Sequence, residues 1–416
     1  MGTTHPAPRA QQQSGGVRER SHHRIVIVGG GTAGITVAAQ LRRAGETDVA
    51  LIEPSEHHYY QPLWTLVGAG IVDAATSQRP EKDYVPAGVR WIRDFVTELD
   101  PDHNLVRTAG GGEVSYDFLV LAPGIQIDWS KTPGLEEALQ TPFVSSNYDY
   151  ALAPKTWEMI RTFRGGTALF TNPGTPIKCG GAPQKIMYLA ADHFRRNKVN
   201  ADVIFGHAGA VIFGVKEFAA VLTDVVARYD IDVHFKRELI EVRPLTKEAV
   251  FKIVGSETGE TETIPYDIMH ATPLQSAPDF VKHSPLALSD NPLGWAKVDK
   301  CTMQSPDFPN VFALGDACSA PNSKTGASIR KQAPVAVQNL RAVMAGKEPM
   351  ATYNGYASCP LVTAHNRMLL AEFDYDMKPA PSIPFINAQK ERYDMYLLKR
   401  YGLPFLYWNG MLRGFA

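Results

Sequence analysis

The chain has 416 residues, of which 44% are hydrophobic and 20% charged, an ordinary composition for a globular protein of two or three domains. Its formal net charge is −1, whereas nucleic-acid-binding proteins usually carry an excess of positive charge, so we expect no nucleic-acid partner. The four cysteines form no CxxC pair and have no histidine at metal-ligand spacing, which argues against a metal site and against a disulfide-rich secreted fold.

Residues 1–22 are rich in Gln, His, Ser, Gly and Arg and poor in apolar residues. Such a composition buries too little apolar surface to fold, and we predict a disordered tail over 1–22. The tail lacks the apolar stretch of a secretory signal, and its three arginines indicate a mitochondrial-type presequence only weakly. No apolar run in the chain approaches the ~18–20 residues that span a bilayer.

The first structured elements form a strand–turn–helix–strand unit. Arg24–Val28 is a short apolar strand, and the turn Gly29–Gly34 follows it directly with the pattern G-x-G-x-x-G. Ile35–Arg43 is then predicted as a helix, and Val49–Ile52 as a strand that ends at Glu53. A glycine pattern in this context predicts a site for an adenine dinucleotide.

Each glycine of that pattern has a physical role. Gly29 permits the tight turn, Gly31 lets the backbone approach a pyrophosphate, and Gly34 lets the helix pack closely on the strand. The helix N-terminus stabilises the phosphate charge. Glu53 can accept hydrogen bonds from ribose hydroxyls. The competing interpretation, a glycine-rich loop without a ligand, is disfavoured by the flanking strand, helix and acid.

Later segments extend the same domain. Tyr116–Ala122 is a buried strand followed by Gly124, and Asn310–Leu314 is a strand followed by Gly315 and Asp316. The Asp316 carboxylate is well placed for the ribityl or phosphate part of a flavin, which predicts FAD. Ala333–Ala345 is predicted as a helix whose N-terminus faces the pyrimidine end of the flavin ring. The FAD-binding domain is therefore discontinuous, over residues 23–130 and 290–350.

A second strand–loop–helix–strand unit follows, formed by Gly166–Phe170, Lys185–Arg195 and Val203–Phe205. Its turn lacks G-x-G-x-x-G, and its second strand leads into Gly206 and His207 instead of an acid. We predict a second Rossmann-like domain over 131–289 that has lost its nicotinamide site. The fold class is therefore α/β, with two three-layer Rossmann-like domains and an aromatic-rich C-terminal segment over 351–416.

Two cysteines are candidates for redox chemistry. Cys179 lies in the second turn between Lys178 and Lys185, just before a helix predicted near Pro183. Nearby cations and a helix N-terminus both favour the thiolate. Cys359 lies 180 residues further on, so only the fold can bring the two together. The alternative is that each is a small buried hydrophobic residue, and the residues alone leave both interpretations open.

Four segments of the chain resemble the sulfide:quinone oxidoreductases, a family of two-domain flavoproteins. They read EPSEHHYYQPLWTLVGAG at 53–70, PIKCGGAPQKIMYL at 176–189, GYASCPLVT at 355–363 and LAEFDY at 370–375. The similarity is greatest to the mitochondrial-like branch and covers residues 23–416. Cys179 and Cys359 match the family's two redox cysteines. The resemblance also implies FAD contacts at Gly31, Thr32, Glu53, Gln61, Val96, Asp316 and Lys324.

The resemblance implies an activity: hydrogen sulfide is oxidised, a quinone takes the electrons, and a small acceptor such as sulfite, glutathione or sulfide takes the sulfur. Lys178 and Lys185 would attract hydrosulfide and stabilise anionic intermediates. Candidates for the quinone site are four aromatic residues, each of which has packing in the core as its alternative. They are Phe373, Tyr375, Phe405 and Tyr407.

Two departures from the family pattern stand out. Ser328–Gln332 is more basic than the small-residue run expected there, and relatives often continue past Gly414 with a basic amphipathic helix.

Even so, the segment Tyr401–Ala416 suits a membrane surface. We expect a peripheral membrane protein, on the cytoplasmic face in a bacterium or on the mitochondrial inner membrane in a eukaryote. A homo-oligomer is left open.

Other functions remain open at this point. The architecture also fits an NAD(P)H:quinone dehydrogenase, although the second turn argues against it. A sulfide dehydrogenase that reduces a cytochrome, and a flavin-based sulfide sensor, are further alternatives.

Overall fold

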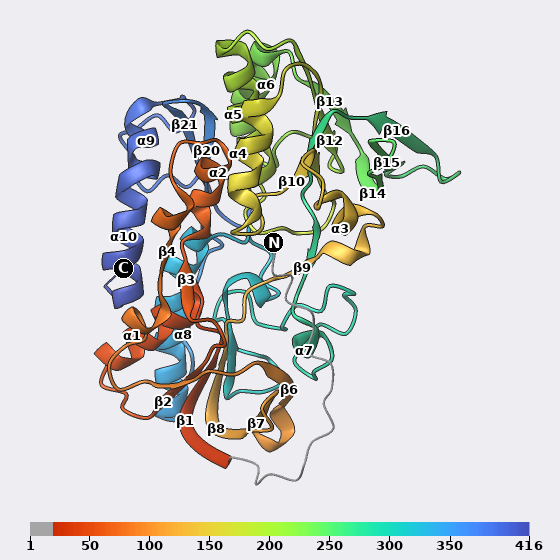
Figure 1. The fold of residues 1–416 in the computed structure, drawn as a ribbon. Helices are drawn as coiled ribbons and strands as arrows, with labels where there is room; N and C mark the ends of the chain where they lie inside the picture. Colours follow the sequence, from red (N-terminus) through yellow and green to blue (C-terminus); the bar gives the residue numbers. More distant parts are fainter. Residues whose placement is uncertain (1–19, 416) are drawn as a thin grey trace.

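The computed structural model describes residues 20–415 (Figure 1). One half of the molecule is built on a sheet in which β1 lies in the middle and pairs in parallel with β2 and β8. The last strand to join, β19, also pairs in parallel with β8, so the chain returns to this sheet late in the sequence. The order is β5-β2-β1-β8-β7-β6. The strands are β1 (Arg20–Val28), β2 (Val49–Ile52), β5 (Arg90–Ile92), β6 (Val96–Asp100), β7 (Leu105–Thr108), β8 (Glu113–Leu121) and β19 (Val311–Ala313).

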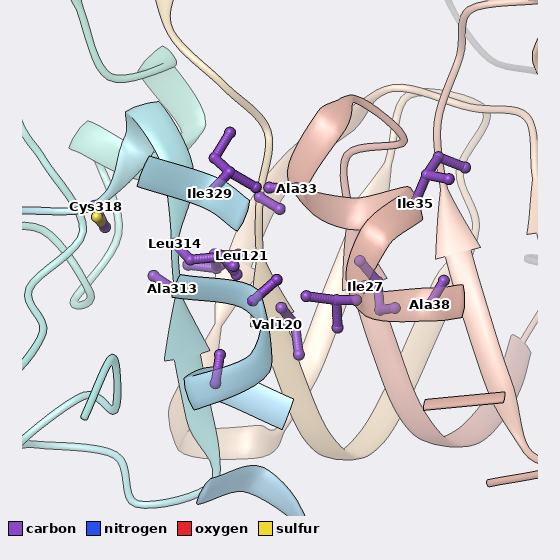
Figure 2. Packing of buried hydrophobic residues seen from close by; sticks show 14 of the residues in the cluster. Ile27, Ala33, Ile35, Ala38, Val120, Leu121, Ala313, Leu314, Cys318 and Ile329 are labelled. Atoms are coloured by element: carbon purple, nitrogen blue, oxygen red, sulfur yellow. The ribbon is translucent and has the colours of Figure 1, made fainter. Parts of the chain in front are cut away.

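Helices α1 (Thr32–Arg43) and α8 (Gly326–Met344) cover this sheet. Figure 2 shows Ala33 and Ala38 of α1 and Ile329 of α8 against the strand residues Ile27 and Val120, all buried in one hydrophobic cluster. The small alanines let the helix approach the sheet closely, which brings the N-terminus of α1 to the end of β1.

The second half has a parallel sheet between two other layers. Its order is β10-β17-β11-β12-β13, and apolar clusters fill the space on both faces. Helices α4 (Leu152–Thr162), α5 (Ala182–Arg196) and α6 (Lys216–Tyr229) pack on one face, and the antiparallel strands β14 (Arg237–Arg243), β15 (Glu248–Ile253) and β16 (Thr261–Pro265) lie on the other. The parallel strands are β10 (Val144–Ser145), β11 (Gly166–Asn172), β12 (Ala201–His207), β13 (Asp232–Phe235) and β17 (Ile268–His270). The predicted α/β class with parallel sheets is thus confirmed.

The C-terminal segment packs against both halves. A hairpin of β20 (Ala357–Ala364) and β21 (Arg367–Phe373) lies against α5, and a helical run then passes along one side of the molecule (Figure 1). This run comprises α9 (Tyr393–Leu397), a π-helical turn (Leu398–Gly402) and α10 (Leu403–Asn409). No helix within residues 20–415 is long and apolar enough to cross a membrane.

Short elements connect these parts. They are β3 (His57–Tyr59), α2 (Trp64–Gly68), β4 (Gln78–Pro80), β9 (Gln126–Asp128), α3 (Leu135–Ala138), β18 (Leu274–Ser276) and α7 (Asp279–Lys282).

Several predicted boundaries differ from the structure, and two differ the most. The first strand begins at Arg20, because residues 20–23 continue the pairing with β8 and Arg20 forms a 2.9 Å ion pair with Glu113. Residues 20–22 of the predicted tail are therefore a strand, and residues 1–19 lie outside the described residues. Helix α8 begins at Gly326, not Ala333, because the Thr325 side chain caps its N-terminus by accepting from Ser328 N.

Candidate active site

The turn between β1 and α1 has a backbone that only glycine allows. Gly29 has φ +96°, and a Cβ there would lie 2.4 Å from Ala122 O. A Cβ on Gly34 would lie 1.8 Å from Gly29 O. At Gly31, by contrast, nothing within residues 20–415 comes within 4 Å of an added Cβ, and no side chain caps α1. Open space therefore faces uncapped helix N–H groups, which fits the pyrophosphate of a dinucleotide.

Glu53 lies beside this turn, at the end of β2. Gly30 N donates to Glu53 Oε2 at 2.6 Å, and Ser55 N donates to Oε1 at 2.8 Å. Burial raises the pKa of the Glu53 carboxyl, and these two backbone hydrogen bonds oppose that shift. Each carboxylate oxygen has a second acceptor position, so the group can also bind ribose hydroxyls.

Other predicted cofactor contacts from distant segments meet nearby. Lys178 Nζ donates to Gln61 Oε1 at 2.6 Å, and Lys324 Nζ donates to Asp316 O at 2.6 Å. Burial raises the pKa of the Asp316 carboxyl, while the charges of Lys178 and Lys324 oppose the shift. A polar cluster of this kind fits the polar edge of a flavin ring and its ribityl chain.

The remaining predicted contacts are Thr32, Val96 and Gly124. Thr32 Oγ1 shares a 2.8 Å hydrogen bond with Tyr407 OH. Val96 begins β6 in the first sheet. Gly124 follows β8 with φ +79°, and no described atom lies within 4 Å of an added Cβ. The role of each residue in cofactor binding stays a prediction.

Cys179 is held by its backbone in the loop before α5. It has φ +60°, a left-handed conformation that is uncommon for a residue with a side chain. Its N–H donates to Lys324 O at 2.7 Å, and its carbonyl accepts from Ala182 N at 2.8 Å, where α5 begins. These two bonds fix the thiol between the helix N-terminus and the polar cluster around Asp316.

Cys359 is brought to Cys179 by β20. It is 1% exposed, and its thiol lies close enough to that of Cys179 for the two to influence each other's pKa, although no disulfide joins them in this structure. Lys185 Nζ lies 3.1 Å from Cys179 Sγ. The Cys359 hydrogen bond, followed by the charges of Lys185 and Lys399, holds the pKa of Cys179 well below its usual range. The same hydrogen bond and burial raise the pKa of Cys359, so Cys179 is the thiolate of the pair.

The two predicted electrostatic residues have different contacts. Lys185 bonds directly to Cys179, whereas the Lys178 ammonium bonds to Gln61 on the cofactor side. A third lysine, Lys399, was not predicted. It is 1% exposed, and burial together with the charge of Lys185 lowers its pKa to about 7.

Lys399 was missed because nothing in its sequence neighbourhood marks it. It stands beside Arg400 in an aromatic-rich segment and resembles a solvated basic residue. In the structure its Nζ donates to Pro62 O at 2.8 Å. It lies close enough to Cys179 and Cys359 for their negative charge to raise its pKa, which partly opposes the effect of burial. Its position on the buried face of the C-terminal helical run is the signal that sequence periodicity offers.

The four quinone candidates do not form one cluster. Phe373 is buried against Phe213, with ring centroids 5.8 Å apart, whereas Phe405 is 71% exposed. Tyr375 OH donates to Lys300 O at 2.6 Å. The fourth, Tyr407, is buried in the other half of the core, and the quinone role of all four stays a prediction.

Tyr407 belongs to a buried polar chain. Its OH lies 2.6 Å from His58 Nε2, and His58 Nδ1 lies 3.0 Å from Glu81 Oε2. Together with the bond to Thr32, this chain connects α10 to the glycine turn. The C-terminal helix is therefore anchored directly on the predicted cofactor site.

A dinucleotide-binding turn, a second Rossmann-like domain and a cysteine pair are features of two-domain flavoproteins, and residues 23–168 match the pyridine nucleotide-disulphide oxidoreductase family model. The chain is 46% identical to the mitochondrial sulfide:quinone oxidoreductase of Mus musculus, over 100% of this chain and 92% of that protein. It is 43% identical to that of Dictyostelium discoideum, over 94% and 86%. The chain belongs to the sulfide:quinone oxidoreductase family.

The fold agrees with this assignment. The crystal structure of the sulfide:quinone oxidoreductase from Aquifex aeolicus superposes with a TM-score of 0.80 at 18% identity, covering 95% of this chain and 92% of that one. At this identity the comparison supports the fold alone. Class and family together imply a flavin cofactor, as the glycine turn predicts.

Proposed function

We propose that this protein oxidises sulfide at Cys179 and Cys359 and passes the electrons through FAD to a quinone. One observation carries the proposal: two neighbouring thiols lie between the buried lysines Lys185 and Lys399 and the polar cluster of the flavin site, with Lys185 Nζ 3.1 Å from Cys179 Sγ. The adenine dinucleotide form of the flavin is supported by the turn at Gly31 and by Glu53.

The cysteine chemistry follows from the pKa difference. In the oxidised enzyme a bridge joins the two sulfurs, and hydrosulfide attacks Cys359 Sγ. A new S–S bond forms on Cys359, the old bridge breaks, and its electron pair leaves on Cys179, the sulfur with the lower pKa and hence the better leaving group. Cys359 then carries a persulfide, and Cys179 is a thiolate.

The cations around the pair serve this step. Lys185 bonds to the departing Cys179 thiolate, and the charge of Lys399 also stabilises it. Both would draw hydrosulfide into the buried site. The flavin, when bound, accepts the two electrons from the cysteines and is re-oxidised by a quinone.

The sulfane sulfur must then leave for a nucleophile, for which we propose sulfite, glutathione or a second sulfide. The nucleophile bonds to the outer sulfur of the persulfide, and Cys359 leaves as a thiolate. The bridge between Cys179 and Cys359 re-forms when the two thiols together lose two electrons, for which a bound flavin would be the acceptor. A homo-oligomer is compatible with this scheme and is not required by it.

Reduction by NADH is disfavoured by the second domain. At the end of β12, where a ribose-binding acid would stand, there is His207. Its Nδ1 lies 2.9 Å from Asn172 Nδ2, and its Nε2 lies 3.0 Å from Val211 O, so both ring nitrogens are occupied. Rapid flavin reduction by NADH would favour the NAD(P)H:quinone dehydrogenase alternative instead.

The exposed face of the C-terminal helical run supports a peripheral membrane contact. Large side chains recur every four residues on this face, and all are exposed: Tyr393, Leu397, Tyr401 and Phe405. We call them the apolar stripe. Such a stripe suits the interface of a bilayer, from which a quinone would come. We propose peripheral association with a quinone-bearing membrane, which is the mitochondrial inner membrane if the source is eukaryotic.

Cysteine replacement tests the proposed function. Cys179→Ser and Cys359→Ser should retain FAD but lose sulfide-dependent reduction of a soluble quinone by at least about 10³-fold, because neither can form the bridge. Cys301→Ser, a partly exposed cysteine outside the pair, is the matched control and should keep its activity. Substantial turnover in either of the first two variants would refute the mechanism.

A further inference from the structure

A hollow of about 280 Å³ lies where the C-terminal end of α1 meets the last turn of the chain. It is at the opposite end of α1 from the glycine turn, so it is separate from the cysteine pair and the flavin site. Arg42 and Arg43 come from the last turn of α1, and Arg413 comes from the C-terminal segment. The rest of the wall carries no charge and is formed by Ala39, Tyr84, Pro86, Ala87 and Leu412.

Within residues 20–415, contacts position the three guanidinium groups without neutralising them. Arg42 Nε donates to Ala87 O at 3.0 Å, and the Arg413 guanidinium lies 4.7 Å from the ring centroid of Tyr84. Within residues 20–415, no carboxylate forms an ion pair with Arg42, Arg43 or Arg413. Three positive charges around a concave space favour the binding of an anion there.

Arginine favours a phosphate because its planar N–H donors match the phosphate oxygens in pairs. Backbone carbonyls and aromatic rings hold the guanidinium groups without cancelling their charge, which leaves donors for an incoming anion. The hollow is large enough for a phosphodiester with part of its glycerol.

The surroundings indicate where that phosphate comes from. Phe415 is exposed and stands 3.8 Å from the Arg43 guanidinium, measured from its ring centroid. The apolar stripe ends at Phe405 on α10, which packs on the turn that carries Arg413. Arginines interleaved with exposed aromatic rings are typical of a protein surface at the headgroup level of a bilayer.

We propose that this hollow binds the phosphate of an anionic phospholipid headgroup. The inference rests on the membrane contact proposed above and adds lipid selectivity to it. The apolar stripe gives binding to any bilayer, and the arginine hollow gives the preference for anionic lipid. Docking at this point would also fix the orientation of α10 on the membrane.

Vesicle flotation of the FAD-loaded protein tests this. The vesicles are phosphatidylcholine alone, or phosphatidylcholine with phosphatidylglycerol. The test variant is Arg43→Gln/Arg413→Gln, and the control is Lys198→Gln/Lys216→Gln, which removes the same charge from two exposed lysines of the second domain. Arg43→Glu serves as a second test variant. Flavin content and sulfide-dependent reduction of a soluble quinone, measured in every variant, report folding and the proposed activity independently of lipid.

We expect the wild type to bind phosphatidylglycerol vesicles more tightly than neutral ones. The Arg43→Gln/Arg413→Gln variant should lose this gain, at about fivefold for each arginine, and still bind neutral vesicles. The lysine control should keep the gain. Equal binding of the wild type to both vesicles, or equal losses in the arginine and lysine variants, would overturn the inference. So would saturable micromolar binding of inorganic phosphate, because the site would then serve a free anion.

Discussion

Lys185 is the lysine that directly contacts the thiol of Cys179. Its Nζ lies 3.1 Å from Cys179 Sγ, and its charge is one of the causes that hold the pKa of that thiol low. Lys185→Met removes the charge and keeps most of the side-chain length. We expect the pKa of Cys179 to rise by about one unit or more. The pH dependence of iodoacetamide alkylation in the dithiol enzyme measures this directly.

The control for that measurement is Lys198→Met, which removes an exposed lysine far from the pair. In the wild type and the control, alkylation should persist as the pH falls below the ordinary thiol range, since the thiolate is lost only on passing through the lowered pKa. In Lys185→Met this fall should move to higher pH. An unchanged profile would mean that the hydrogen bond from Cys359 alone stabilises the thiolate.

At the scale of single residues, the family resemblance predicted those site residues that stand within recognisable sequence motifs. Cys179 and Cys359 were predicted because each stands in a long, specific segment, but their contact depends on 180 residues of intervening fold. Lys399 is different, since its importance comes only from burial. The apolar stripe repeats every four residues, which leaves Lys399 on the opposite face of the helix, against the site. This four-residue spacing is the sequence signal that places Lys399 on the buried face, and no motif around the residue itself does so.

At the scale of elements, the turn between β1 and α1 separates glycines needed for folding from one needed for the ligand. A Cβ on Gly34 would collide with Gly29 O, so Gly34→Ala should destabilise even the flavin-free protein, by about 1–3 kcal/mol. Gly31→Ala meets no described atom within 4 Å, and Gly31 has an ordinary φ of −68°. That variant should fold normally and lose flavin.

Two measurements distinguish these glycines: the flavin-to-protein ratio after purification, and the thermal midpoint of the flavin-free protein. Gly31→Ala should lower the first alone, and Gly34→Ala should lower both. Thr223→Ala, at an exposed position of α6 in the second domain, is the control and should change neither quantity. Normal flavin content in Gly31→Ala would place the pyrophosphate elsewhere.

Element boundaries were predictable where apolar periodicity decides them and not where pairing or capping does. The strand Val49–Ile52 was predicted with its observed bounds because all its residues are buried. The N-terminal part of β1 was missed because its residues are all polar and gain their partners only from β8. Helix α8 was predicted too short because Pro334 suggests a helix start, whereas here it lies within the helix.

At the scale of the whole molecule, the C-terminal helical run connects two different environments. One face reaches the site: Lys399 Nζ bonds to Pro62 O, and Tyr407 bonds to Thr32 and His58. The opposite face presents the apolar stripe, on the side of the molecule where α9 and α10 lie in Figure 1. If this stripe enters a bilayer, a quinone diffusing there has only the thickness of one helix between it and the buried site.

The stripe can be tested by a single charge. Phe405 is 71% exposed on α10, and Phe405→Glu should weaken binding to neutral vesicles by roughly 2 kcal/mol or more, about thirtyfold, because its ring would no longer enter the interface. Turnover with a long-chain quinone held in vesicles should fall in step. Turnover with a soluble quinone separates the two roles proposed for Phe405: it stays unchanged when the ring contacts only the bilayer, and it falls when the ring also lines the quinone site. Leu245→Glu is the control, since Leu245 is 93% exposed in the turn between β14 and β15. These two strands lie on the side of the molecule opposite α9 and α10 in Figure 1. If both variants lose vesicle binding alike, or neither does, the membrane does not contact this face.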